Sequence, residues 1–165
     1  MVNKTQIQNT LVRIEKLYQR HIGDYRGKYF AKLAIIETCG WIEECMDDIV
    51  RRCAAKHLSD KKNIAFVDKL IEDIHSFKYS HFRNMLIQVL GIVNVERLEQ
   101  TYNQNKFDQM SSSLGSLKKR RDDQAHTYIK GTTQIIDAPS LTRSRFEKAY
   151  DGLKDIETCV RKLKF

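Results

Sequence analysis

The stretch from Lys28 to Lys56 constrains the fold more than any other part of the sequence. Its apolar residues recur at the three- and four-residue spacing of an α-helix, and they fall on more than one side. One side carries Ile35, Ile42, Met46, Ile49 and Cys53, and a second side carries Phe30, Ala34, Trp41 and Cys45. A helix that is apolar on two sides must be surrounded by other elements, so this stretch predicts the central, buried helix. Gly40 within it indicates the close approach of another helix.

Shorter amphipathic stretches predict further helices around the central one. Ile7, Leu11, Ile14 and Tyr18 form one stripe of a first helix that begins near Lys4. The same spacing predicts helices over residues 63–75 and 82–90, a short turn over 94–102, a long helix from Ser113 or Ser116 to Lys130, and a last helix that Ser140 or Thr142 caps. Asp60 is expected to cap the third helix and Gly91 to end the fourth. Loops are expected at 23–27, 103–106, 111–113 and 137–140.

Helix breakers are scarce in the whole chain. It has one proline, Pro139, and seven glycines in 165 residues, which argues against a sheet with many tight turns. The sequence therefore predicts an all-α protein, an up-and-down bundle of about five main helices with extra short helices in the middle. We expect one domain over residues 1–165, in which about 76–113 form an irregular helical insert.

The composition limits the compartment and the partners. The net charge is +8, which favours a polyanionic partner such as RNA, although a basic surface also serves solubility alone. Cys39, Cys45, Cys53 and Cys159 show no C-x-x-C spacing, and no His/Cys cluster suggests a metal, so reduced thiols and no cofactor are expected. The N-terminus lacks an apolar signal segment, and no run of 18 apolar residues occurs, which predicts a cytoplasmic protein without membrane attachment.

Chemically useful side chains are most concentrated between Leu117 and Tyr128. This stretch carries Lys118, Lys119, Arg120, Arg121, Asp122, Asp123, His126 and Tyr128 on one expected helix. On charge alone, the stretch is a solvated helix face on which Asp122 or Asp123 pairs with neighbouring Lys or Arg. The other histidines stand singly, and there is no glycine-rich phosphate loop.

The pattern of residue types favours a second interpretation. Arg121, Asp122, Ala125 and His126, followed by Tyr128, form the pattern R-[N/D]-x-x-A-H-x-Y. This closely resembles the R-x4-H signature of the HEPN superfamily (higher eukaryotes and prokaryotes nucleotide-binding). The acidic and apolar stretch from Trp41 to Val50 resembles the early helix of HEPN domains found in toxin–antitoxin and other defence loci. The resemblance covers about residues 28–165, and residues 76–113 depart from a minimal HEPN domain.

The resemblance implies a HEPN-like bundle with the activity of a metal-independent endoribonuclease. Arg121 and His126 would be the catalytic pair, and two copies would face one cleft in a homodimer. In HEPN toxins whose antitoxin is a small nucleotidyltransferase, the tyrosine that matches Tyr128 can be adenylylated, so the resemblance implies Tyr128 as a candidate site of modification. An antitoxin of this or another kind, or another component of a phage-defence system, is therefore a possible partner besides RNA.

The expected chemistry does not depend on the family. RNA carries its own nucleophile, the 2′-hydroxyl, and a histidine can take that proton or protonate the leaving oxygen. Arg121 can hold the phosphate and stabilise the charge of the transition state. Asp122 could orient the pair, Tyr128 could pack beside it, and Glu43 either pairs with Arg121 or is an exposed carboxylate.

Binding of the RNA backbone is expected from the cations that precede the pair, which are Lys118, Lys119 and Arg120. Two alternatives to a ribonuclease stay open. One is a non-catalytic HEPN module that binds a nucleotide or a protein. The other is a plain helical interaction protein in which the R-x4-H pattern arises by chance.

Overall fold

The computed structural model describes residues 2–74, 76–125 and 136–163. These residues form helices and connecting segments without any strand, which confirms the predicted all-α class. None of the described helices combines the length and the apolar character needed to cross a membrane. The helices are α1 (Thr5–Arg20), α2 (Tyr25–His57), α3 (Lys61–Glu72), α4 (Tyr79–Leu90), α5 (Ile92–Glu99), α6 (Gln104–Ala125) and α7 (Pro139–Lys162).

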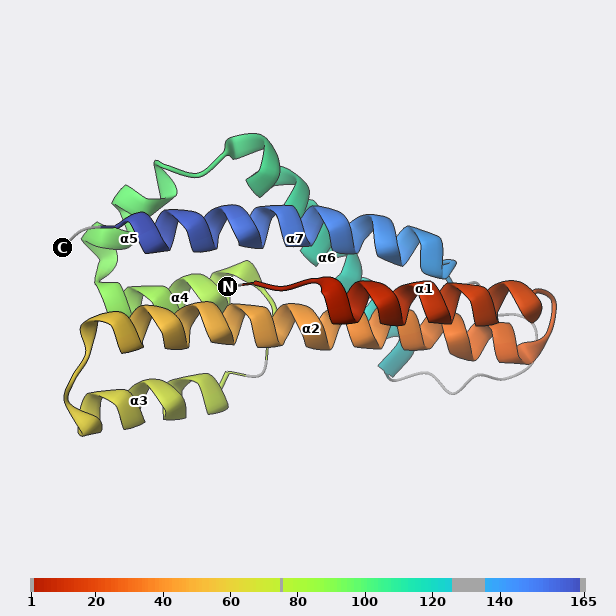
Figure 1. The fold of residues 1–165 in the computed structure, drawn as a ribbon, viewed down its shortest axis with the longest axis horizontal. Coiled ribbons are helices and arrows are strands. Elements are labelled where there is room, and N and C mark those ends of the chain that lie inside the picture. The colour runs from red at the N-terminus through yellow and green to blue at the C-terminus, as the bar shows by residue number, and fades with distance from the viewer. Residues whose placement is uncertain (1, 75, 126–135, 164–165) are drawn as a thin grey trace.

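Helix α2 is the axis of the molecule (Figure 1). α1 returns antiparallel along the N-terminal half of α2, and α7 runs in the same direction as α2 and packs against α1, α2 and α6. α3 folds back against the C-terminal half of α2, while α4 packs against α2 and continues into α5. The region predicted as an irregular insert, 76–113, consists of α4, α5 and the first turns of α6.

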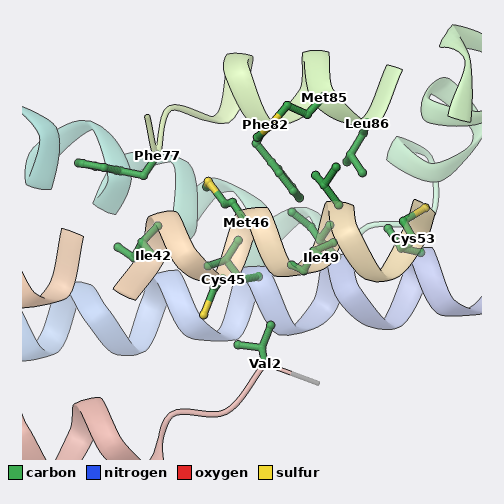
Figure 2. Close-up of a cluster of buried hydrophobic side chains, with 14 of the residues drawn as sticks. Val2, Ile42, Cys45, Met46, Ile49, Cys53, Phe77, Phe82, Met85 and Leu86 are labelled. Carbon is green, nitrogen blue, oxygen red and sulfur yellow. The ribbon is translucent and has the colours of Figure 1, made fainter. Parts of the chain in front are cut away.

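The core confirms that α2 is apolar on more than one side. On the first side, Ile35, Ile42 and Met46 are fully buried among side chains from α4, α6 and α7. On the second side, Ala34 is fully buried in a separate cluster with Ile7, Leu11 and Ile14 of α1. Figure 2 shows Phe82 and Leu86 of α4 pointing toward α2, with Met85 above Phe82 and Phe77 at one end of the cluster. Cys39, Cys45 and Cys53 are also buried in this cluster, as free thiols that pack like small apolar side chains.

Two helix ends agree with the prediction because a residue that favours a helix end occurs there. Asp60 caps α3, because its Oδ1 accepts hydrogen bonds from the backbone N–H groups of Lys62 and Asn63. Gly91 follows α4 with a φ of 77°, which confirms its predicted role as a glycine stop.

Other boundaries differ from the predicted ones. α2 begins at Tyr25, inside the predicted 23–27 turn, because Asp24 caps it by accepting a hydrogen bond from the Arg26 N–H. α7 begins at Pro139 rather than after a cap at Ser140 or Thr142, since proline fits the first turn of a helix.

The largest error concerns the start of α6. Residues 103–106 and 111–113 were predicted as loops, yet α6 begins at Gln104 and includes the three serines. Asn103 supplies the start signal, because its Oδ1 accepts a hydrogen bond from the Lys106 N–H. Met110, Ser113 and Leu114 are buried, so tertiary packing keeps this serine-rich stretch helical.

Close helix approach occurs at a glycine other than Gly40. A Cβ added at Gly40 would meet no described atom within 4 Å. A Cβ added at Gly152 of α7 would lie 2.5 Å from the Cβ of Met110 on α6. Gly152 therefore allows α6 and α7 to pack closely, whereas no helix of the described chain approaches Gly40.

Candidate functional site

The basic segment predicted as the site occupies the last turns of α6. Leu117 is buried, and its carbonyl oxygen lies 4.0 Å from the Cys39 Sγ of α2. Arg121 follows Leu117 by about one helical turn and lies half-buried at the margin of the core. Phe77, which precedes α4, completes the corner where the three segments meet.

Arg121 is held from two directions. Its guanidinium carbon lies 4.9 Å from the centre of the Phe77 ring, and its Nη2 lies 3.5 Å from Asp122 Oδ1. A guanidinium over an aromatic face is attracted by the negative face of the ring. The side chain is still 33% exposed. Arg121 is therefore a partly ordered cation that an anionic ligand can reach.

Asp122 pairs with the helix neighbour one turn before it as well as with Arg121. The Lys118 ammonium bonds to Asp122 Oδ2, and this bond lowers the pKa of the Asp122 carboxyl. The pairing confirms the expectation that an aspartate here engages a neighbouring cation. The Lys118 ammonium is consequently paired with a carboxylate of its own helix.

The three cations predicted to bind RNA do not share one face. Arg120 Nε lies 3.0 Å from Asp137 Oδ2, and Arg145 of α7 binds the same oxygen at 2.7 Å. Lys119 is exposed, while Lys118 is engaged with Asp122. Consecutive residues of a helix point about 100° apart, so adjacent cations face different surroundings. Arg120 therefore joins α6 to the segment before α7, and Lys119 is the most exposed of the three.

Glu43 lies near Arg121 but is not its bonded partner. Burial raises the pKa of the Cys39 thiol to about 12, while Arg121 lowers it and Glu43 raises it, which places both charges around this cysteine. Arg121 bonds to Asp122 instead, and Glu43 Oε1 is buried without a hydrogen bond to any described residue. Glu43 is thus neither paired with Arg121 nor a fully exposed carboxylate.

His126 and Tyr128 lie outside the described residues, as does His75. The pairing of His126 with Arg121 and the role of Tyr128 therefore stay predictions from the sequence. Within the described ranges, no group of three or more His, Cys, Asp or Glu side chains could hold a metal ion.

A pocket that the sequence did not predict lies beside Phe77, the aromatic ring that Arg121 contacts. It has a volume of about 230 Å³ and lies between the start of α4 and the middle of α6. Its lining includes Phe77, Lys78, Ser80, Ser111 and Lys118. Two ammonium groups and two hydroxyls are groups that bind phosphate and ribose oxygens. The sequence predicted a loop at 111–113, and only the fold brings this stretch next to Phe77, Lys78 and Ser80.

A second basic pocket lies at the other end of α2 and is separate from this corner. It has a volume of about 380 Å³ and includes Arg52, Lys56 and Arg161 together with Glu157. Glu157 is only 3% exposed, and it binds Arg52 at 3.3 Å and Lys154 at 3.0 Å. Arg52 is therefore paired with a buried carboxylate of the protein itself, and the Lys56 ammonium donates to the Arg161 carbonyl oxygen.

Comparison with protein-family models, with curated proteins and with solved structures gives no match for the chain. The resemblance to HEPN proteins accordingly rests on the residues of the motif and on the stretch around Glu43.

Proposed function

We propose that this protein is a metal-independent endoribonuclease of the HEPN type, acting in a toxin–antitoxin or phage-defence system. The observation that carries the proposal is the R-x4-H-x-Y pattern that begins at Arg121. The position of Arg121 supports it, because the guanidinium is oriented by Phe77 and Asp122 and is still open to a ligand. The neighbouring pocket with Lys78, Ser80 and Ser111 offers contacts for the RNA backbone.

The proposed reaction uses the RNA's own 2′-hydroxyl. The 2′-oxygen attacks the adjacent phosphorus, its proton passes to a base, and the bond from phosphorus to the 5′-oxygen breaks. The leaving oxygen takes a proton, so the products are a 2′,3′-cyclic phosphate and a 5′-hydroxyl. His126 is proposed to carry the proton, and Arg121 to stabilise the negative charge on the phosphoryl oxygens.

A homodimer follows from the spacing of the pair. Residues five apart on a helix are separated by about 140° around its axis, so Arg121 and His126 do not stack on one face. Two copies that meet near these residues can combine the arginine of one with the histidine of the other. We propose that Tyr128 lies at the same place and that a nucleotidyltransferase-type or other antitoxin acts there.

The test is cleavage of total RNA by the purified protein in EDTA, which disables contaminating metal-dependent nucleases. We expect the parent to leave cyclic-phosphate ends. His126→Ala and Arg121→Ala are expected to lose on the order of 100-fold or more in rate. His57→Ala and Arg97→Ala serve as matched controls, because these residues lie at the end of α2 and on α5.

Equal cleavage by parent and His126→Ala would reject the proposal. If neither protein cleaves any RNA, the non-catalytic module becomes the better interpretation. Binding of an oligoribonucleotide would then be measured at several salt concentrations, with Arg121→Ala beside the parent.

A further inference from the structure

The pocket between the C-terminal ends of α2 and α7 is separate from the Arg121 corner and takes no part in the proposed ribonuclease reaction. The two helices run in the same direction (Figure 1), and their last turns lie side by side, because the Lys56 ammonium donates to the Arg161 carbonyl oxygen at 3.3 Å. The pocket volume of about 380 Å³ falls within the roughly 300–1,000 Å³ of small-molecule sites. The space is therefore sufficient for a small organic ligand.

The deep part of this pocket is apolar. Ile49 and Cys53 of α2 and Val160 of α7 line it, and all three side chains are buried. Figure 2 shows Ile49 and Cys53 on the stretch of α2 that α7 runs beside. Burial raises the pKa of the Cys53 thiol to about 11, so this wall carries no charge at neutral pH. A space with such walls favours a ligand with an apolar body.

The mouth of the pocket is cationic. Arg52, Lys56 and Arg161 line it, and all three are exposed to solvent. Lys56 has three N–H donors and uses one of them in its bond to the carbonyl oxygen of α7. The Arg161 guanidinium forms no hydrogen bond or ion pair with any described residue. Lys56 and Arg161 therefore have donors available for an anion at the mouth.

One carboxylate, that of Glu157, also lines the pocket, and its charge is balanced within the protein. It accepts the Val2 N–H at 3.0 Å, and it binds Arg52 at 3.3 Å and Lys154 at 3.0 Å. These contacts offset the repulsion that a bare carboxylate would exert on an anion. They also account for two of the nearby cations, and they leave the two in the last helical turns without a carboxylate partner among the described residues.

Cations in the last turn of a helix can also serve to offset the negative end of the helix dipole. That role requires neither a cavity nor buried apolar walls beneath the charges. Lys162 belongs to the same last turn of α7 as Arg161, but it is not one of the residues that line the pocket. The two neighbours therefore separate the dipole role from a ligand-binding role in an experiment.

We propose that this pocket binds a small amphipathic anion, a carboxylate or phosphate monoester with an aliphatic chain. The chain packs against Ile49, Cys53 and Val160, and the head group accepts hydrogen bonds from Lys56 and Arg161. Such a ligand contacts both α2 and α7, which are brought together only in the folded chain. Its binding therefore stabilises the folded protein.

The probes are decanoate and decyl phosphate, which share one chain and differ in the head group. The full-length protein is titrated with each probe by calorimetry, below the critical micelle concentration. Binding of either anion to a single site is expected and identifies the preferred head group. Decylamine, which is cationic at neutral pH, and decanol, which is neutral, should bind about tenfold more weakly or less. Inorganic phosphate, which lacks the chain, should not compete.

Failure of both anions to bind would overturn the proposal. Equally tight binding of decylamine or decanol would overturn it too, because the cations would then contribute nothing. Competition by inorganic phosphate would show that the apolar walls contribute nothing, with the same consequence. None of these measurements involves RNA, so their outcome is independent of the proposed ribonuclease.

Placement of the ligand is tested with two variants and two methyl groups. Arg161→Gln should weaken binding of the anion about tenfold, which corresponds to one charge-assisted hydrogen bond, whereas Lys162→Gln should bind like the parent. In methyl NMR spectra, the Ile49 signal should shift on binding, and the signal of Ile14, in the separate cluster with α1, should not. Circular dichroism checks that both variants are folded. Equal losses in the two variants, or an unchanged Ile49 signal, would overturn the proposal.

Discussion

Asp47 on α2 carries a charge in unfavourable surroundings. Burial raises the pKa of its carboxyl to about 6, Arg51 offsets part of this, and Glu43, Glu44 and Asp48 add to the rise. The group therefore binds its proton more tightly in the folded chain than in the unfolded chain. At neutral pH, folding has to accommodate an ionised carboxylate that is poorly solvated.

The stability contribution of Asp47 should consequently fall as the pH rises. It is fully present below the unfolded pKa, near 4, and is lost as the pH passes through about 6. Asp47→Asn should be more stable than the parent by about 1–2 kcal/mol at pH 8 and should lose this advantage at pH 4. Urea unfolding at several pH values measures this, and a pH-independent difference would contradict it.

Asp48→Asn is the control for Asp47, since Asp48 is an exposed neighbour that lies 3.8 Å from Arg52. Its effect on unfolding should be small at every pH, because an exposed ion pair contributes little. The comparison separates the burial of Asp47 from the general removal of negative charge from α2.

At the scale of the helices, the helix ends that are set by a capping residue could be predicted from the sequence. The helix boundaries that depend on packing against another helix could not. Asp60 and Gly91 identify helix ends because capping needs only local geometry. The start of α6 was missed because Ser111 to Ser113 favour loops, and the packing of Met110 against Gly152 of α7 has no local signal in the sequence.

In the candidate site, too, contacts between neighbours in the sequence could be predicted and contacts between distant segments could not. The bond between Lys118 and Asp122 could be predicted from the spacing of four residues along α6. The bond from Arg120 to Asp137 and the contact of Arg121 with Phe77 join segments that are distant in the chain. The sequence contains no local signal for either contact.

The glycines give the sharpest test at this scale. Gly152→Ala should destabilise the protein by about 1–3 kcal/mol, because the new Cβ would lie 2.5 Å from the Cβ of Met110. Gly115→Ala on α6 should instead stabilise it by about 0.5–1 kcal/mol, since nothing described lies within 4 Å there. Thermal unfolding of the two variants should shift in opposite directions, and shifts of the same sign would contradict this packing.

For the whole molecule, Glu157 joins segments from both ends of the described chain. Its carboxylate accepts the Val2 N–H at 3.0 Å and binds Arg52 of α2 and Lys154 of α7. Burial alone would raise the pKa of Glu157, but the Val2 and Lys154 hydrogen bonds leave it below its usual value of 4.5. One carboxylate thus fixes the segment before α1 against α2 and α7.

Glu157→Gln should lower the free energy of unfolding by about 1–3 kcal/mol at pH 7, because the amide cannot replace both charged bonds. The pKa is lowered, so the stabilisation is present above pH 4.5 and is lost as the pH falls through the folded value. Chemical denaturation of parent and variant should therefore converge in acid. Glu96→Gln, at an exposed position on α5, should match the parent throughout, and an equal loss there would show that the Glu157 contacts are unimportant.

The position of α7 has a consequence for the protein during its synthesis. α7 is the last described helix to leave the ribosome, and it packs against α1, α2 and α6. Chains are made at about 5–20 residues per second, so for several seconds α6 exists without the helix that orders it. A nascent chain therefore holds Arg121 on a helix that can pack against α2 but not yet against α7, so the surroundings of Arg121 are completed only after α7 has been made.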